Sequence, residues 1–292
     1  MPPQPTAANE RLPRAPHRRL WSSALLLALM ALIALEVLWR SLGYTPSITD
    51  NQALWAQQRQ RVETANKDTL LLLGSSRILQ AFNAQAFHET LPDQEYIQLA
   101  IGGLHPMATL QDIAENTTFS GTVLCSITAE SLLPELHDQQ QPWIDYYHNS
   151  FLPHSNAERR LHTALQSRLT LLLPDLLLQE ALPKLLRGAP PIQYLVNAPD
   201  RTQIVDYNKV DLQEFTRIQL KKVGVNVSHY INLPDYHNFP RELDQIETAV
   251  QTIHQRGGRV VFLRMPTTGP YFEATDKYFP RTRFWDIFAA QT

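Results

Sequence analysis

The chain has 292 residues, a formal net charge of -2 at pH 7 and a hydrophobic fraction of 43%. This length and composition suffice for a sizeable buried core, and the charge balance argues against a nucleic-acid partner, which would require a basic surface. A single cysteine, Cys125, excludes a disulfide within these residues and a cysteine-based zinc site; its place in the apolar run Thr122 to Ile127 predicts a buried strand residue.

The N-terminal region changes abruptly from polar to apolar. Residues 1–20 are rich in proline and predict a disordered tail, whose basic residues are Arg11, Arg14, Arg18 and Arg19. From Trp21 to Trp39 the sequence is apolar except for two serines and Glu36. As a helix this run would span roughly 28 Å, close to the hydrocarbon thickness of a bilayer. Residues 21–42 therefore predict a transmembrane anchor, with Glu36 near enough to its end to reach lipid headgroups.

The distribution of arginines predicts the orientation of this anchor. Because they lie on its amino side, we expect a cytoplasmic tail, a single pass through the inner (plasma) membrane and an extracytoplasmic, periplasmic remainder. A cleaved signal peptide with its apolar core at Ala24 to Leu35 is one alternative, but residues 36–39 lack a small-x-small cleavage site. A buried helix of a soluble protein is the other alternative.

Residues 43–292 predict an α/β domain. Apolar runs bounded by turn residues predict four strands, at residues 69–73, 95–100, 122–127 and 259–263. Helical patterns lie between them at residues 77–88, 106–119 and 241–255, and a further helix is expected from Thr49 or Asp50 to Val62. Strands that alternate with helices indicate a parallel sheet with right-handed crossovers.

The region at about residues 131–240 interrupts this alternation and is predicted to be a helical insertion. Two leucine-rich segments, Ala157 to Leu173 and Leu176 to Leu186, have the pattern of amphipathic helices, which would form a lid on the domain or a surface for a protein partner. We expect an exposed connection at Pro190 to Pro199 and mostly polar loop from there to Pro240.

Two short turns carry the chemistry that the sequence suggests. Gly74-Ser75-Ser76 ends the first predicted strand, and Gly102-Gly103 ends the second. In a parallel sheet both turns lie at the carboxyl edge, so a backbone N–H at Gly103 would face the Ser76 oxygen, as an oxyanion hole requires. The serines would otherwise only cap the following helix, and the turn lacks the later glycine and the lysine of a P-loop.

Two segments resemble the first sequence blocks of the SGNH (GDSL-like) hydrolases: residues 71–77, Leu-Leu-Leu-Gly-Ser-Ser-Arg, and residues 98–103, Gln-Leu-Ala-Ile-Gly-Gly. The likeness is greatest to membrane-anchored members associated with bacterial cell-surface polysaccharides, and residues 261–266 and 279–285 are similar to later parts of that branch. The resemblance covers about residues 68–130 and 240–290. It implies a flavodoxin-like three-layer α/β sandwich with a parallel sheet.

The resemblance also implies roles for individual residues. Ser76 takes the place of the nucleophile, Ser75 stands where the family usually has Asp, and Gly103 would supply the second oxyanion donor. The family's third block normally brings an Asn after the third strand, but here Thr128-Ala129-Glu130 follows it.

The family's fourth block, an Asp-x-x-His turn beyond the last strand, has no counterpart after Leu263, where the sequence holds no histidine. A serine hydroxyl without an adjacent base is a poor nucleophile, so this departure bears on the chemistry. One explanation is that the natural chain continues beyond Thr292 into this block.

Two further explanations remain for the absence of this histidine. His105, close to the second turn, or His237, with Asp235 two residues before it, would take its place. Otherwise the domain binds without cleaving.

The sequence therefore predicts a membrane-anchored serine esterase or O-acyltransferase that acts on acyl esters, with acetyl the favoured group, of cell-envelope glycan. The alternative is a non-catalytic adaptor or glycan-binding protein of a polysaccharide export or modification system. The expected partners are the glycan or an acyl donor, the membrane through the N-terminal helix, and a protein through the helical insertion. No cofactor is expected. No metal site is expected either, because the spacings of the histidines and aspartates in residues 137–154 match no helical i, i+4 pair and are explained by a loop composition.

Overall fold

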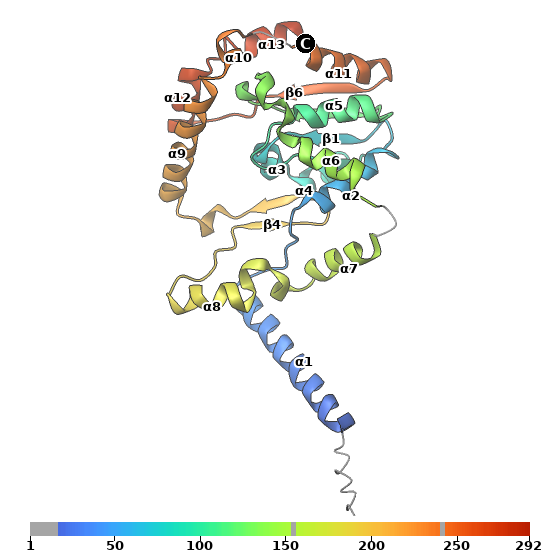
Figure 1. The fold of residues 1–292 in the computed structure, drawn as a ribbon, viewed down its shortest axis with the longest axis vertical. Coiled ribbons are helices and arrows are strands. Elements are labelled where there is room, and N and C mark those ends of the chain that lie inside the picture. The colour runs from blue at the N-terminus through green and yellow to red at the C-terminus, as the bar shows by residue number, and fades with distance from the viewer. Residues whose placement is uncertain (1–16, 153–155, 240–242) are drawn as a thin grey trace, which may run out of the picture.

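The computed structural model describes residues 17–152, 156–239 and 243–292. It consists of a head from which a long N-terminal helix, α1 (His17–Ser41), leaves as a stalk (Figure 1). Residues 17–20 are helical, so the disordered tail predicted over residues 1–20 is wrong at its end, and its first 16 residues lie outside the described residues. By length and composition α1 matches a membrane span or a signal sequence.

Two charged side chains near the end of α1 tie it to the head. Glu36 accepts hydrogen bonds from the backbone N–H groups of Thr170 (3.0 Å) and Leu171 (2.9 Å), in the 3₁₀ turn η4 (Thr170–Leu172). Arg40 pairs with Glu36 at 2.6 Å and donates to the Arg168 carbonyl at 2.5 Å. Glu36 therefore connects the end of α1 to the insertion, a role that the sequence alone did not indicate.

Four apolar segments form a parallel sheet, as predicted. They are β1 (Leu70–Leu73), β2 (Tyr96–Gln98), β3 (Thr122–Ser126) and β6 (Arg259–Leu263), in the spatial order β2-β1-β3-β6. All neighbouring pairs are parallel. The chain moves from β1 outward to β2 and then returns past β1 to β3. The carboxyl ends of β1 and β3 thus mark a topological switch point, where open α/β sheets form a crevice.

Helices cover both faces of this sheet. Helices α3 (Ser76–Ala81) and α4 (Ala84–Thr90), between β1 and β2, pack on the face that carries Leu72. The opposite face, with Leu71 and Leu73, packs against α2 (Gln52–Val62), α5 (Met107–Asn116), α6 (Gln141–Asn149) and α11 (Asp244–Gln255). Right-handed crossovers place helices on both faces here. The connection from β1 to β2 crosses the sheet in one direction and the later connections cross it in the other, so their helices lie on opposite faces.

Two helices begin at residues other than those predicted, because asparagine side chains cap them. The helix expected at residues 77–88 is two helices, because Phe82 and Asn83 adopt extended backbone and the Asn83 side chain accepts from the Ala86 N–H at 3.0 Å, starting α4. Helix α2 is capped by Asn51, not by Thr49 or Asp50. An asparagine side chain satisfies a backbone N–H that the first helical turn leaves unpaired.

The insertion contains more regular structure than the sequence predicts. The leucine-rich segments form α7 (Asn156–Gln166) and α8 (Leu178–Leu186), with η4 and η5 (Pro174–Leu176) between them. The expected connection at residues 190–199 includes β4 (Leu195–Asn197), which pairs antiparallel with β5 (Gln203–Val205).

Other described elements, besides a long helix given next, are η1 (Ala129–Leu132), η2 (Pro134–Gln140), η6 (Tyr207–Lys209), α10 (Pro234–His237), α12 (Gly269–Tyr278) and α13 (Trp285–Gln291).

The polar loop predicted between Pro199 and Pro240 is wrong, because this stretch contains the 19-residue helix α9 (Leu212–Tyr230) as well as β5, η6 and α10. The Asp211 carboxylate accepts from the N–H groups of Gln213 (2.9 Å) and Glu214 (3.1 Å) and starts this helix. An Asp followed three residues later by Glu is a known signature of a helix start, so the signal was present in the sequence. The irregular spacing of its apolar residues obscured it.

A buried ion pair links α2, α5 and α6 beneath the sheet. The Arg59 side chain is fully buried, and it donates to Asp112 at 2.6 Å and to Glu63 at 2.6 Å. His148 lies 2.7 Å from the other Asp112 oxygen. Desolvation by burial acts to lower the pKa of Arg59, but the two carboxylates outweigh it and raise the pKa, so the guanidinium stays charged.

Replacing Asp112 with alanine is expected to lower the free energy of unfolding by about 3–5 kcal/mol, because it leaves the buried Arg59 charge without its main partner. Urea denaturation of the full chain in detergent, followed by circular dichroism, measures this. Glu115→Ala is the matched control: Glu115 lies exposed on the same helix and its substitution should leave the unfolding midpoint nearly unchanged. Equal midpoints for the two variants would refute the stabilising role of the pair.

Candidate active site

A pocket of 160 Å³ lies at the carboxyl ends of β1, β2 and β3. Its floor is formed by the three loops that follow these strands, which contribute Ser75 and Ser76, Gly103 to His105, and Thr128 with Glu130. The pocket is therefore at the topological switch point of the sheet. Ser76, Gly103 and His105, all singled out from the sequence, line it together.

Gly74 allows the first of these loops to turn against β3. Its φ is +146°, and a Cβ at this position would lie 2.7 Å from the Ile78 side chain and 2.9 Å from the Ser126 carbonyl oxygen. Only glycine fits such a close approach of two strand ends. The Gly74 carbonyl accepts from the Ile101 N–H at 3.0 Å and from the Gln140 amide at 3.3 Å, so the loops after β1 and β2 are fixed to each other.

The two serines differ in their place at this turn. Ser75 is the N-cap residue of α3 and its side chain makes no capping hydrogen bond, while Ser76 is the first helical residue. Within the described part of the chain no hydrogen bond engages the Ser76 hydroxyl. A Cβ on Gly102 would lie 4.0 Å from the Ser76 Cβ, so the second turn packs directly against this serine. The hydroxyl is thus left available to a ligand in the pocket.

Gly103 and His105 come from the loop between β2 and α5. Gly103 has a φ of +81°, and a Cβ there would meet open space. The glycine is needed for its backbone conformation rather than for close packing. His105 is half-buried, and its Nδ1 lies 2.8 Å from the Ser131 hydroxyl oxygen in η1. That contact orients the imidazole ring in the pocket wall.

Burial lowers the pKa of His105 below its ordinary value of 6.5. The Glu130 carboxylate opposes this change, and His137 and Arg77 add to it. His105 is therefore neutral near pH 7, which is the state in which an imidazole accepts a proton.

The lowered pKa predicts a pH dependence of stability. Between the folded pKa of His105 and the unfolded value of 6.5, the unfolded chain binds more protons, so stability rises with pH across this window. The contribution is complete above the unfolded value and is lost as pH falls below it. Urea titrations from about pH 8 to about pH 5 should show a shallower loss of stability for His105→Asn than for the unchanged chain. Identical slopes would contradict a His105 imidazole that the pocket wall keeps neutral.

The roof of the pocket comes from segments far along the chain. Helix α9 contributes Val223, Asn226, Val227 and Tyr230, and α12 contributes Tyr271. The two helices pack side by side at the edge of the head (Figure 1). Arg77, beside Ser76, donates to the Tyr271 hydroxyl at 3.2 Å and lies 5.5 Å from the centre of its ring. Sequence reasoning missed Asn226 and Tyr230 because it expected loop where α9 lies.

The other predicted histidine does not join this site. Asp235 and His237 belong to α10, and neither lines the pocket. The neighbouring Tyr236 is buried against Phe279 and Phe284, while His237 is exposed. Of the two substitutes considered for the missing base, the structure brings only His105 to the pocket that contains Ser76.

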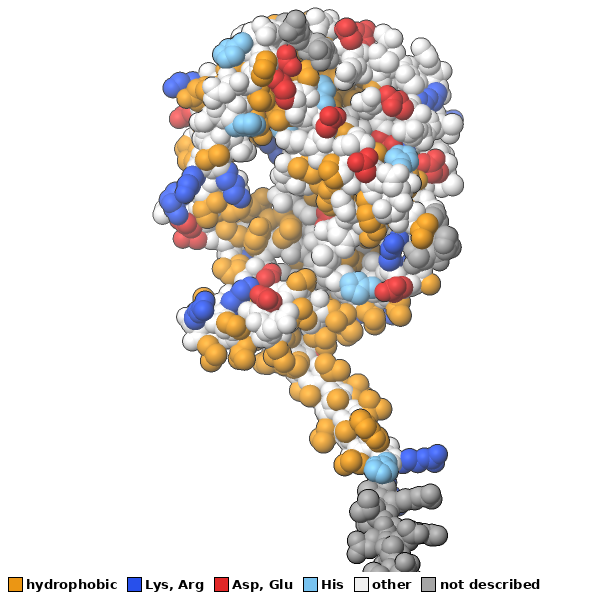
Figure 2. All heavy atoms as spheres, viewed as in Figure 1, with side chains coloured by type: hydrophobic (Ala, Val, Ile, Leu, Met, Phe, Trp, Pro, Cys, Tyr) orange, Lys and Arg blue, Asp and Glu red, His pale blue; other side chains and the backbone are white. Residues whose placement is uncertain are grey.

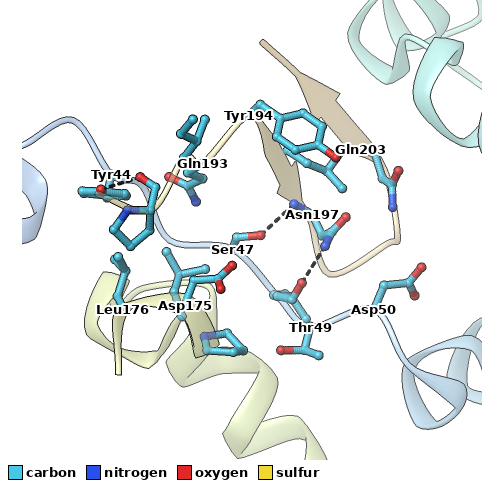
Figure 3. Close-up of a pocket in the computed structure, with 16 residues that line it drawn as sticks. Tyr44, Ser47, Thr49, Asp50, Asp175, Leu176, Gln193, Tyr194, Asn197 and Gln203 are labelled. Atoms are coloured by element: carbon cyan, nitrogen blue, oxygen red, sulfur yellow. Dashed lines mark hydrogen bonds between the residues drawn. The ribbon is translucent and has the colours of Figure 1, made fainter. Parts of the chain in front are cut away.

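A larger pocket of 380 Å³ lies between residues 44–50, η5 and the segment that leads into β4 (Figure 3). Its polar groups are largely used to hold these segments together. The Asn197 N–H donates to the Ser47 hydroxyl at 2.9 Å and its amide donates to the Ile48 carbonyl at 2.9 Å. None of the catalytic residues predicted from the sequence lines this pocket.

Comparison with protein-family models, curated proteins and solved structures found no match in any of the three. Among the described residues no group of three or more His, Cys, Asp or Glu side chains is placed to hold a metal ion. The chemistry of the site therefore has to be inferred from its own side chains.

Proposed function

We propose that the chain is a membrane-anchored, SGNH-like serine esterase or O-acyltransferase of the extracytoplasmic face. Its substrates are acyl esters, with acetyl the favoured group, of cell-envelope glycan. The observation that carries the proposal is the pocket in which Ser76, Gly103 and His105 meet at the carboxyl ends of the sheet.

In the proposed reaction the Ser76 oxygen attacks the ester carbonyl while His105 accepts the hydroxyl proton. The Gly103 N–H is placed to stabilise the negative charge that develops on the carbonyl oxygen. Collapse of the tetrahedral intermediate expels the alcohol, which takes the proton from His105 and leaves an acyl group on Ser76. Water then releases the acid in an esterase, or a glycan hydroxyl takes the acyl group in a transferase.

The surroundings of His105 support its role as the base. When its Nδ1–H donates to the Ser131 hydroxyl, the lone pair of Nε2 remains for the serine proton. The Ser131 hydroxyl also accepts from the Thr128 N–H at 3.1 Å, which fixes the position of this acceptor. Glu130, on the same 3₁₀ turn, favours the protonated imidazole that forms during the reaction.

Two features support membership of the SGNH group. The parallel strands follow the flavodoxin-like order 2-1-3-4, with helices on both faces of the sheet. Asn226 of α9 also brings a side-chain amide to the pocket, which is the group that the loop after β3 lacks. We assign Asn226 as an additional oxyanion donor.

Helix α1 supports the membrane part of the proposal. Its exposed side chains are apolar over most of its length, and Arg18 and Arg19 lie at its amino end. We assign a single pass through the inner membrane with the head on the periplasmic side, as the excess of arginines before the apolar run favours.

A fluorophosphonate probe, which forms a covalent adduct with activated serine hydroxyls, tests the proposal. The full chain purified in detergent should be labelled, and peptide mass spectrometry should place the adduct on Ser76. His105→Asn should slow the labelling strongly. An adduct on Ser75 instead, or no labelling of folded protein, would contradict the assignment of Ser76 as nucleophile.

A non-catalytic adaptor or glycan-binding protein of a polysaccharide export or modification system is the second candidate. The roof of the pocket favours it, because Tyr230, Tyr271 and Asn226 are side chains of the kind that stack on sugar rings and bind their hydroxyls. This candidate predicts no probe labelling together with saturable binding of acetylated oligosaccharides, measured by tryptophan fluorescence. Binding would then persist in Ser76→Ala.

A further inference from the structure

Seven exposed leucines lie at the base of the head, next to the point where α1 leaves it. We call them the leucine patch: Leu161 and Leu165 of α7, Leu177 just before α8, and Leu178, Leu182, Leu185 and Leu186 of α8. Hydrophobic side chains cover this underside of the head around the stalk (Figure 2). So many exposed leucines on one face of a soluble protein would be unusual, and such patches mark interaction sites.

The pattern within α8 is that of an amphipathic helix. Leu178, Leu182, Leu185 and Leu186 follow the i, i+4, i+7, i+8 spacing of one helical face, and Leu186 is 79% exposed. Ala181, at the border of this face, is fully buried. The helix thus uses a small residue to pack on the head and presents its large apolar side chains outward.

Packing fixes the position of α8 relative to α1. Ala181 and Leu176 form a buried cluster with Trp39, which is 3% exposed near the end of α1. The hydrogen bonds of Glu36 and Arg40 to residues 168–171 add a second connection between the two segments. A head held in this way cannot swing freely on its tether, so the leucine patch keeps one orientation to the axis of α1.

The exposed apolar surface of α1 extends to the end of the helix that adjoins the leucine patch. Leu38 and Leu42, at the head end of the helix, are 48% and 57% exposed. Two basic side chains accompany the patch: Lys184 of α8, which pairs with Asp175 at 3.0 Å, and Arg187, which directly follows this helix. Long basic side chains next to an apolar helical face are typical of segments that lie in the interface of an anionic membrane.

We infer that the leucine patch is embedded in the headgroup and upper acyl region of the leaflet from which α1 emerges, so that the head lies on the membrane in a fixed orientation. This inference rests on the anchor assigned to α1 under the proposed function. A bilayer is favoured over a protein as the occupant because the patch surrounds the segment that the membrane itself would hold.

Site-specific fluorescence in reconstituted vesicles tests this inference. The full chain is placed in vesicles of phosphatidylethanolamine and phosphatidylglycerol, with an environment-sensitive dye on Leu182→Cys. The native Cys125 is fully buried and stays unlabelled in the folded protein. Gln251→Cys, exposed on α11 in the head, is the matched control, and Leu29→Cys reports on α1 itself.

The dye at residue 182 should be quenched by lipids with a nitroxide high on the acyl chain. Its quenching by aqueous iodide should be at least ~3-fold weaker than at residue 251, as expected of interfacial burial. Equal iodide quenching at residues 182 and 251 would overturn the inference, and lipid quenching at residue 29 would show that the anchor itself stands. Absence of lipid quenching at residue 29 would instead reject the anchor. Protection of residue 182 from both quenchers, with energy transfer between labelled copies, would assign the patch to a second copy of the chain and also overturn the inference.

Discussion

Replacing Ser76 with alanine is expected to abolish hydrolysis of a small activated acetyl ester, with a loss in kcat of at least ~10³-fold. The reason is that the serine oxygen forms the bond to the acyl group, and no other described side chain replaces it in the same position. The pocket would keep its shape, because alanine retains the Cβ that the second turn packs against, and the hydroxyl has no hydrogen-bond partner among the described residues. The full chain in detergent should therefore lose kcat while its unfolding midpoint stays the same.

Ser228→Ala is the matched control for this measurement. Ser228 lies on α9, is exposed, and its hydroxyl donates to the Gly224 carbonyl of its own helix, at 2.8 Å. Its rate should equal that of the unchanged chain. Equal rates for Ser76→Ala and the unchanged chain would remove Ser76 as the nucleophile, even if hydrolysis were observed.

Replacing Arg201 with alanine is expected to lower the free energy of unfolding by about 3–5 kcal/mol, because it leaves a partly buried carboxylate and two buried carbonyls without their donor. The Arg201 side chain is fully buried and pairs with both oxygens of Asp50, at 2.7 and 2.9 Å. It also donates to the carbonyls of Gln98 and Ala100, each at 2.9 Å. The guanidinium therefore joins the β4–β5 hairpin to the end of β2.

Two other substitutions at this position separate the effect of the lost side chain from the effect of the backbone conformation. Arg201 has a φ of +66°, in the left-handed region that disfavours residues other than glycine. Arg201→Gly should therefore be less destabilising than Arg201→Ala by about 1 kcal/mol. Arg201→Lys should also be less stable than the unchanged chain, because an ammonium group cannot reproduce the bidentate geometry. Urea denaturation measures all three variants.

Arg217→Ala provides the control for removal of an arginine that is exposed. Among the described residues Arg217 bonds to Glu214 alone, on the same helix, at 2.6 Å, and its loss should leave the unfolding midpoint unchanged. If Arg201→Ala behaved in the same way, the buried guanidinium would have no structural role. Because Ala100 lies two residues before Gly102, a destabilised Arg201→Ala should also lose activity through displacement of the Gly102-Gly103 turn.

Local sequence signals predicted the sheet and much of the pocket floor. Each strand is a short apolar run that ends at small or polar residues, so its length and its turn are visible within a few residues. The two glycine turns and His105 lie next to such strand ends, and parallel strands necessarily bring their carboxyl ends to one edge. Ser76, Gly103 and His105 could therefore be predicted as neighbours from their positions alone.

The choice between His105 and His237 could not be made from the sequence. Both are polar residues near apolar segments, and only the packing of Tyr236 against Phe279 and Phe284 places α10 away from the pocket. The roof of the pocket was missed for a related reason. Helix α9 buries few side chains, so its apolar pattern is weak, and its position depends on contacts with α12 and the strand ends.

The sequence by itself determined that the chain has an N-terminal helix apolar enough to cross a membrane and a parallel α/β sheet with serine and glycine turns at its edge. Periodicity and turn residues are local properties, and they are sufficient for these conclusions. Only the tertiary structure decided that Arg201 clamps β2, that α9 covers the pocket, and that Glu36 and Trp39 fix the leucine patch beside α1. These contacts join residues more than 90 positions apart, and their geometry follows from packing that no short stretch of sequence specifies.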